Sequence, residues 1–163
     1  MDALPIEIIV KCGNAPIFTL SFARMRYMKI YHTKIDPYAG TSYSEIERKA
    51  RKDYQAIAKL SKRNVYVRSK YFNNEKIFLS LFWEHLNQKP RRERKLRLRY
   101  YCCALDLLRN TRQKPASKEN PNRHGELLHR FAGVTRDNDL FYVQVKENRK
   151  TGNKHLMSVF SPG

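Results

Sequence analysis

The chain has few of the features that mark common protein classes, and the first of these is cysteine. Its 163 residues contain three cysteines, which are Cys12 and the adjacent pair Cys102 and Cys103, and none stands in CxxC spacing. An odd number without that spacing indicates neither a disulfide framework nor a zinc site. We therefore expect a reducing, cytoplasmic setting.

Recognisable catalytic and membrane motifs are also missing. The sequence has no HxxxH, no clustered pair of acidic residues, no P-loop and no GxSxG. These absences count against metal-dependent hydrolysis, nucleotide hydrolysis and α/β-hydrolase chemistry, and we expect neither a metal nor a cofactor. No apolar run approaches the roughly 18 residues of a spanning helix, and no signal peptide stands out, so we expect no membrane partner.

Acidic residues are scarce relative to basic ones. The chain has 33 Lys and Arg against 15 Asp and Glu, which gives a formal net charge of +18. This balance favours a polyanionic partner, with nucleic acid ahead of an anionic membrane. Hydrophobic residues make up 41% and aromatic residues 12%, which is enough for a core and argues against general disorder.

Apolar periodicity predicts an α+β fold, with helices packed on a C-terminal antiparallel sheet. Apolar residues recur at helical spacing over 44–60, 75–88 and 92–110. The alternating, aromatic-rich stretch Val65–Phe72 is typical of a strand that joins the sheet, and Asn73-Asn74 interrupts it. Residues 111–126 have prolines, asparagines and no periodicity, so we predict a loop.

The length fits one domain with a small appendage. We assign residues 41–163 to an α+β domain and residues 1–40 to an N-terminal extension of uncertain structure. Met25 and Met28 are candidates for an alternative translation start within that extension.

A basic run follows Pro90, and we predict that it binds phosphate groups. Cations at a helix start oppose the helix macrodipole, so helix stability alone does not explain them. The alternative is an ordinary solvated helix face. Lys70, on the strand that precedes the helices, is a further candidate. The candidates within the run are Arg91, Arg92, Arg94, Lys95 and Arg97.

The stretch 127–160 predicts a three-stranded meander, because three alternating runs are separated by the turns Asp137-Asn138 and Thr151-Gly152. This register places Arg130, Gln144 and Ser158 side by side on one face. Tyr142 and Lys146 share that face, and the opposite face is predicted to join the core through Phe131, Val143, Val145, Met157 and Val159. A slip of one residue would put His129 in place of Arg130.

The polar face of the meander carries groups that suit phosphate chemistry. Arg130 and Lys146 can bind a phosphate and stabilise its developing charge, and Ser158 can donate to a phosphoryl oxygen. Tyr142 can stack on a base, and Gln144 lies beside it in the predicted site. An ordinary solvent-facing sheet surface is the alternative interpretation, because polar residues alternate outward on any half-buried sheet.

Histidines are the candidates for proton transfer near neutral pH. His124 lies in the predicted loop, and His129 begins the first strand of the meander, where the predicted register turns it toward the core. A buried histidine with satisfied hydrogen bonds is the alternative for His129. We assign His85 and Trp83 to helix packing and His155 to the surface.

The segment LLHRFAGVTRDNDLFYVQVKENRKTGNKHLMSVFSP resembles the closing sheet of the small metal-independent RNases of phages and mobile elements, the barnase–EndoU–colicin–RelE-like group. Ser158, Phe160 and Pro162 match the last-strand pattern of that group, with Ser161 inserted, and Arg130 and Lys146 match by strand position. The resemblance implies short helices before a curved antiparallel sheet and an RNA-cleaving, metal-free site on the sheet face. It also implies that RNA is favoured over DNA.

Together these observations lead to a hypothesis of a toxin- or phage-type endoribonuclease. Attack by the ribose 2′-OH on the adjacent phosphate would leave a cyclic phosphate, with His124 or His129 moving a proton. The first alternative is a non-catalytic RNA- or DNA-binding protein of a mobile element. The second is a protein whose basic surface binds an acidic antitoxin or inhibitor protein, or ribosomal RNA.

Overall fold

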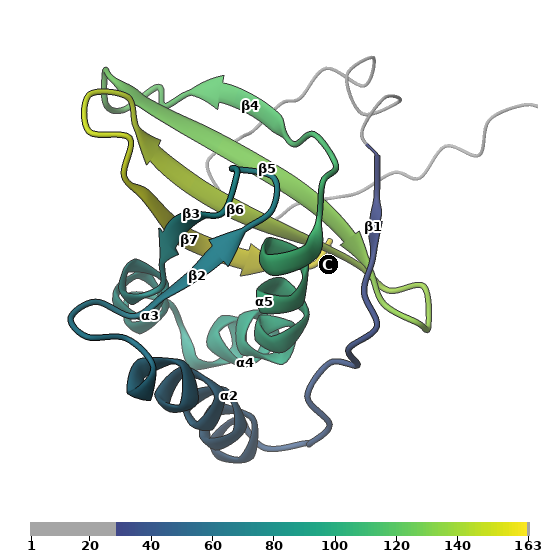
Figure 1. Ribbon diagram of the computed structural model, residues 1–163. Helices are drawn as coiled ribbons and strands as arrows, with labels where there is room; N and C mark the ends of the chain where they lie inside the picture. Colours follow the sequence, from purple (N-terminus) through teal and green to yellow (C-terminus); the bar gives the residue numbers. More distant parts are fainter. Residues whose placement is uncertain (1–28, 163) are drawn as a thin grey trace, which may run out of the picture.

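The computed structural model describes residues 29–162 and shows an α+β fold (Figure 1). Within these residues a mixed sheet of 7 strands has the order β1-β5-β6-β7-β3-β2, and β4 lies beside β5. Four helices, α2 to α5, lie together on one side of the sheet and form the core with it. No helix in this part of the chain is long and apolar enough to cross a membrane.

The centre of the sheet is the predicted meander. Its strands are β5 (Glu126–Val134), β6 (Leu140–Asn148) and β7 (Lys154–Phe160), paired antiparallel. Asn138 and Gly152 have φ values of 64° and 74°, which is the left-handed backbone expected for the two turns. The register is also confirmed, because Arg130 pairs with Gln144 and Gln144 pairs with Ser158.

A bulge in β7 corrects one predicted core residue. Gln144 pairs with Ser158, but the next residue, Val145, pairs with Leu156, so β7 carries one extra residue at Met157. An extra residue reverses the alternation of side chains beyond it. Leu156 is therefore fully buried and Met157 is only half-buried, whereas Phe131, Val143, Val145 and Val159 are buried as predicted.

The predicted helix 75–88 is wrong over its first turn. Residues Glu75–Phe78 form strand β3, which pairs antiparallel with β2 (Tyr66–Ser69). Asn73 and Asn74, which the sequence places at the end of the strand, have φ values of 52° and 63° and close a hairpin. The two left-handed residues end the five-residue connection between Ser69 and Glu75, and asparagine tolerates that conformation.

The hairpin extends the sheet at β7. β3 pairs in parallel with β7 only at Lys154 and His155. The helix α3 (Ser80–Asn87) then follows, and both α3 and α4 pack against β7. The predicted strand Val65–Phe72 therefore does join the sheet, through Tyr66–Ser69, which form its edge strand β2 beside β3.

The remaining helices follow the predicted pattern with one interruption. α2 (Tyr43–Lys59) begins at Ser42, whose side chain accepts a hydrogen bond from the Glu45 amide at 3.2 Å. The predicted helix 92–110 consists of α4 (Arg91–Arg99) and α5 (Tyr101–Asn110). Tyr100 separates them, with φ −96° and ψ 7°.

Two short strands cover the other edge of β5. The predicted loop 111–126 contains β4 (Ala116–Glu119), which pairs antiparallel with the first half of β5, and β1 (Tyr31–His32) pairs in parallel with its end. The Tyr31 hydroxyl also donates to Asp106 at 3.0 Å. The described part of the predicted extension thus contributes β1 to the sheet, and residues 1–28 lie outside the described residues.

Candidate nucleic-acid interface on the outer sheet face

The side chains of the sheet that point away from the helices form a second surface, which we call the outer face. Cross-strand pairing arranges this face in three rows. The first row contains Tyr66, Phe78, His155, Lys146, Leu128 and Lys118; the second contains Ser158, Gln144, Arg130 and Ala116; and the third contains Phe160, Tyr142 and Ala132.

The second row holds the predicted polar set together. Arg130 Nη2 donates to Gln144 Oε1 at 3.3 Å, and the Gln144 amide lies 3.6 Å from Met157 Sδ. The guanidinium carbon of Arg130 lies 5.0 Å from the ring centre of Phe160 and 5.9 Å from that of Tyr142. The faces of aromatic rings attract a cation, so these two rings help to orient the guanidinium.

Arg97 connects the basic run to this row. β3 pairs with β7 only at Lys154 and His155, the first two residues of β7. The rest of β7 is therefore free of β3, and α4 packs against it. From α4, Arg97 Nη1 donates to Ser158 Oγ, and its Nη2 lies 3.5 Å from Glu93 Oε2. Arg97 and Ser158 belong to two separate candidate sets in the sequence, and no pattern there indicates that they meet.

Other cations of the basic run bind parts of the fold. Arg94 donates to the backbone oxygens of Asn87 at 2.7 Å and Lys89 at 2.6 Å, where α3 ends. A guanidinium there satisfies helix carbonyls that have no partner in the helix. Lys95 donates to the Thr41 carbonyl, and Arg91 lies 5.2 Å from the Tyr43 ring centre, whereas Arg92 is exposed.

The first row brings a histidine beside Lys146. His155 pairs with Lys146 across β6 and β7, and its ring centre lies 5.4 Å from that of Phe78. Burial lowers the pKa of His155, and the positive charge of Lys146 lowers it further. Lys146 Nζ lies 3.4 Å from Glu126 Oε1. If side chains alternated without interruption from Ser158 back along β7, His155 would face the core. The bulge at Met157 shifts the alternation by one residue and turns His155 to the outer face.

His85 approaches the same region from α3. Its pKa is lowered mainly by burial and also by Lys146, while a hydrogen bond to the Met157 backbone acts in the opposite direction. Neutral imidazoles can accept protons, which is the property that a general base needs. The sequence gives no signal for this position, because helical spacing alone assigns His85 to packing.

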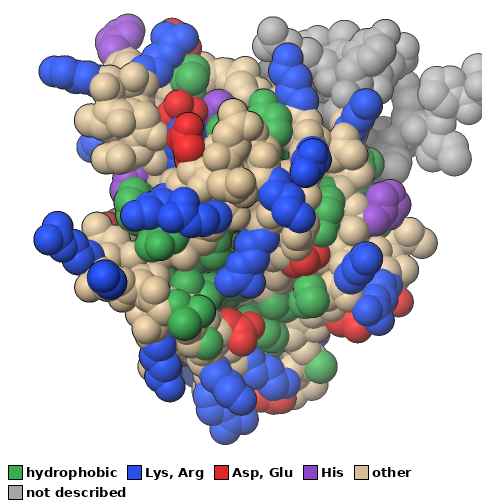
Figure 2. Space-filling model, in the orientation of Figure 1, with side chains coloured by type: hydrophobic (Ala, Val, Ile, Leu, Met, Phe, Trp, Pro, Cys, Tyr) green, Lys and Arg blue, Asp and Glu red, His purple; other side chains and the backbone are tan. Residues whose placement is uncertain are grey.

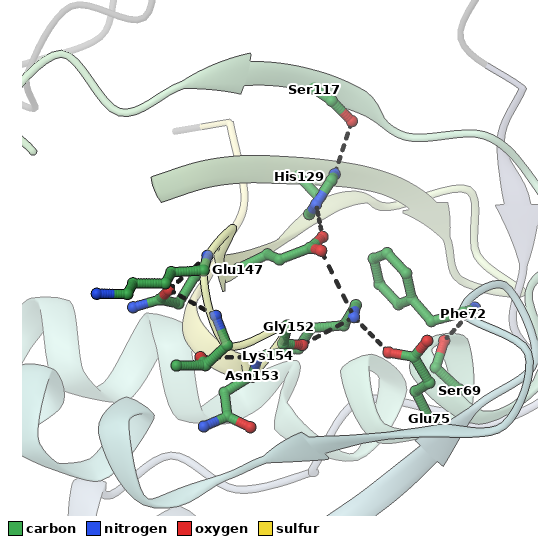
Figure 3. Close-up of polar contacts among 12 residues, drawn as sticks. Ser69, Phe72, Glu75, Ser117, His129, Glu147, Gly152, Asn153 and Lys154 are labelled. Carbon is green, nitrogen blue, oxygen red and sulfur yellow. Dashed lines mark hydrogen bonds and ion pairs between the residues drawn. The ribbon is translucent and has the colours of Figure 1, made fainter. Parts of the chain in front are cut away.

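His129 lies on the core-facing side of the sheet, as the predicted register had it, within a chain of polar contacts (Figure 3). Its Nδ1 lies 2.7 Å from Ser117 Oγ, and its Nε2 lies 2.7 Å from Glu147 Oε2. Lys154, only 4% exposed, continues the chain at 3.6 Å from Glu147 Oε1 and donates to Glu75. These contacts bind one side chain from each of five neighbouring strands.

Two further candidates lie away from the rows of the outer face. His124 is exposed in the turn before β5, and six residues along a strand separate it from Arg130, which corresponds to about 20 Å at ~3.3 Å per residue. Lys70 lies at the end of α5, where its Nζ is 3.4 Å from Asn110 Oδ1. The structure therefore brings together Arg97, Arg130, Gln144, Ser158, Tyr142 and Lys146, but not His124, His129 or Lys70.

The wider surface and the thiols complete the chemistry of the described chain. Figure 2 shows Lys and Arg side chains spread over the whole visible face, with Asp and Glu in a few small groups. Among residues 29–162 there is no group of three or more His, Cys, Asp or Glu side chains placed to hold a metal ion. Cys102 and Cys103 are buried, and their sulfurs contact the carbonyls of Asp36 and Ile35 at 3.3 Å.

Comparison with known proteins found no matching family model, no matching curated protein and no matching solved structure. A function for this chain therefore has to be inferred from the residues and geometry of the outer face.

Proposed function

We propose that this protein is a metal-independent endoribonuclease that cleaves single-stranded RNA on the outer face of its sheet. The observation that supports the proposal is the meeting of Arg97 and Ser158, from α4 and β7, beside Arg130. Lys146 and His155 lie in the adjacent row. Cations, a hydroxyl and a histidine are thus gathered on one surface of a protein with net charge +18.

Arg97 and Arg130 bind the scissile phosphate in this proposal. Both guanidinium groups lie at the row of Gln144 and Ser158, one reaching in from α4 and one from β5. A guanidinium presents a planar fork of donors that fits two phosphate oxygens at once. Ser158, which accepts a hydrogen bond from Arg97, keeps its own hydroxyl proton for a third oxygen. Such donors act most strongly on charge that develops in the transition state.

The reaction transfers protons at two oxygens. The ribose 2′-oxygen attacks phosphorus while its proton passes to a neutral base, for which His155 is our candidate and His85 the second. The bond from phosphorus to the 5′-oxygen breaks, and that oxygen takes a proton from an acid or from water. The products are a 2′,3′-cyclic phosphate and a free 5′-OH, so no water is consumed in this step. Lys146 stabilises the negative charge beside the base.

The third row favours RNA that is not base-paired. The rings of Tyr142 and Phe160 lie 5.5 Å apart with an interplanar angle of 33°, and both are half-buried on the outer face. Only bases released from a duplex expose their faces to such rings. The 2′-OH required by the chemistry distinguishes RNA from DNA.

Cleavage of labelled single-stranded RNA in EDTA tests the proposal. We expect a cyclic phosphate product, and no cleavage 3′ of a single 2′-deoxy residue. Arg130→Ala should lower the cleavage rate by about 10²–10³-fold, as loss of one transition-state donor does. Its free energy of unfolding should fall by only about 1 kcal/mol, the size of a cation–π contact.

Arg92→Ala is the matched control for the arginine substitutions, because Arg92 is exposed on the same helix as Arg97. It should cleave at nearly the wild-type rate. Wild-type protein that binds RNA but leaves it intact for hours, in EDTA and in Mg²⁺, would contradict the proposal. The protein would then be a nucleic-acid-binding protein without catalytic activity.

A further inference from the structure

The β2–β3 hairpin carries a surface that the proposed reaction does not use. Tyr66 and Phe78 pair across the two strands on the outer face, and Arg68 pairs with Lys76 one step along. We call these four residues the aromatic platform. The row that begins with Tyr66 and Phe78 continues directly into His155 and Lys146.

Two cations lie beside the Tyr66 ring of the platform. Lys76 Nζ lies 4.6 Å from the ring centre of Tyr66, and the guanidinium carbon of Arg68 lies 5.7 Å from it. The Tyr66 and Phe78 rings lie 6.4 Å apart, edge to face. Arg68 also donates to the Asn74 carbonyl at 2.9 Å, which ties it to the hairpin turn.

The hairpin does not need these side chains for its core contacts. Val67 and Ile77, on the other face of the same strands, are 3% and 0% exposed and pack into the core. Tyr66 and Phe78 remain half-buried, and Arg68 and Lys76 are exposed. A cation lying over a ring can move to a phosphate and leave the ring face to a base, because both side chains are long and flexible.

We infer that the aromatic platform is a subsite for single-stranded RNA, in which Tyr66 stacks on a base and Arg68 and Lys76 contact phosphates. The inference rests on the proposed function for the choice of RNA. Strands lie about 4.8 Å apart, so three spacings separate Tyr66 from Lys146 by about 14 Å. One strand of RNA lying across the sheet thus reaches both the platform and the reactive rows.

The surface continues past the platform at the β2 edge. A hollow of about 220 Å³ borders Tyr66 and Arg68 and is also lined by Leu60 and Arg109. Leu60 is 86% exposed, the highest value among the large hydrophobic side chains of the described residues. An apolar side chain beside two cations suits the face of a further base and its phosphate.

The test is binding of a short single-stranded 2′-O-methyl oligonucleotide, which has no free 2′-OH and so stays intact. It carries 2-aminopurine, whose fluorescence falls when it stacks on a ring. Tyr66→Ala should weaken binding by about 5- to 100-fold, the range for loss of one stacked base, and should reduce the quenching. Tyr66→Phe should bind and quench like the wild type, because the ring is retained.

Charge variants of the same hairpin provide a matched set. Arg68→Ala and Lys76→Ala should each lower the slope of log affinity against log salt by about one, as loss of a phosphate contact does. Lys70→Ala removes the same charge from the same hairpin but away from the platform, and it should leave the slope unchanged. These variants keep the test decisive if Tyr66→Ala fails to fold.

Three results would overturn the inference. The first is Tyr66→Ala binding and quenching like the wild type. The second is salt slopes for Arg68→Ala and Lys76→Ala that match Lys70→Ala. The third is a loss of affinity for poly-glutamate in Tyr66→Ala that equals its loss for the oligonucleotide. Poly-glutamate has no bases, so this result would assign the platform to an acidic protein.

Failure of the platform and failure of the nuclease can be separated. If Tyr66 matters for the oligonucleotide but RNA with free 2′-OH groups stays intact, the platform stands and the cleavage proposal fails. If RNA is cleaved, and Tyr66→Ala binds and cleaves it as the wild type does, only the platform fails.

Discussion

The two faces of one sheet hold polar side chains in opposite ways. On the core-facing side, Lys154 lies between the carboxylates of Glu75 and Glu147, and His129 lies between Glu147 and Ser117 (Figure 3). Both His129 and Lys154 are buried. The polar groups on this side therefore satisfy one another's hydrogen bonds and charges.

On the outer face, the cations Arg97, Arg130 and Lys146 are half-buried and have neighbours of several kinds. Arg97 has Glu93 at 3.5 Å and Lys146 has Glu126 at 3.4 Å. Arg130 contacts the Gln144 amide and aromatic rings. A buried charge is tolerated when it is paired, whereas a half-buried cation remains open to an anion from outside. Under the proposed function, the core-facing side chains support the fold and the outer face binds RNA.

The largest effect on stability should come from Lys154→Ala. It leaves two carboxylates without their shared cation and opens space beside Phe72, whose ring centre lies 5.0 Å from Nζ. Breaking a buried ion pair costs about 3–5 kcal/mol, and the low end applies because Glu75 is 58% exposed. We expect the free energy of unfolding in urea to fall by about 3 kcal/mol.

Lys150→Ala is the charge-matched control, because Lys150 is exposed in the turn before the same strand. It should change stability by less than about 0.5 kcal/mol. If Lys154→Ala is no less stable than Lys150→Ala, the chain of contacts does not support the fold, and the distinction between the two faces is lost.

The next effect separates the faces within one strand. Val143 is fully buried, and its neighbour Gln144 points to the outer face. Val143→Ala should lower the free energy of unfolding by about 2 kcal/mol, a core truncation, and leave RNA cleavage by the folded protein unchanged. Gln144→Ala should lower the rate of RNA cleavage by more than can be explained by the fraction of folded protein lost, as measured by thermal unfolding. Reversed results in these two assays would mean that the faces are assigned the wrong way round.

The register behind that test was predictable from the sequence because alternation and turn residues are local signals. Strands with one apolar face specify their register strongly, which is why Arg130, Gln144 and Ser158 were found as neighbours. The bulge at Met157 has no comparable signal, so His155 was assigned to the surface but its pairing with Lys146 on the outer face could not be predicted.

Contacts between segments that are distant in the sequence could not be predicted, for a different reason. Arg97 and Ser158 are 61 positions apart, and they meet only because the β2–β3 hairpin ends early along β7. That hairpin was itself predicted in part as helix, since Ile77 and Phe78 also fit helical spacing with the residues after them. Two left-handed asparagines decide in favour of the strand.

A smaller effect distinguishes two arginines of the basic run. Arg94 binds backbone oxygens at the end of α3, and Arg97 reaches the outer face. Arg97→Ala should reduce the salt slope of RNA binding by about one. Arg94→Ala should keep that slope but lower the free energy of unfolding by about 1 kcal/mol, the value of a typical hydrogen bond. Equal slopes for the two variants would remove Arg97 from the interface.

The smallest effect concerns protonation of His155. Its pKa lies below the ordinary value of histidine because of burial and the charge of Lys146, while Glu84 and Glu126 act in the opposite direction. Lys146→Gln removes the positive charge, so the pKa of His155 should rise. The neutral base then appears only at higher pH, and the acid limb of the cleavage profile should move upward. Titration of the His155 ring protons by NMR measures the same shift in the absence of RNA.

Stability gives an independent check on the sign of that shift. A folded-state pKa below the unfolded value means that, as pH falls through about 6.5, the unfolded chain takes up a proton before the folded chain does. His155 therefore makes the wild type less stable as pH falls through that window. Lys146→Gln brings the folded pKa closer to the unfolded one, so its stability should decline less between pH 7 and pH 5. A pKa of His155 that does not move in Lys146→Gln would mean that Lys146 and His155 do not share one site, and the base would have to be His85.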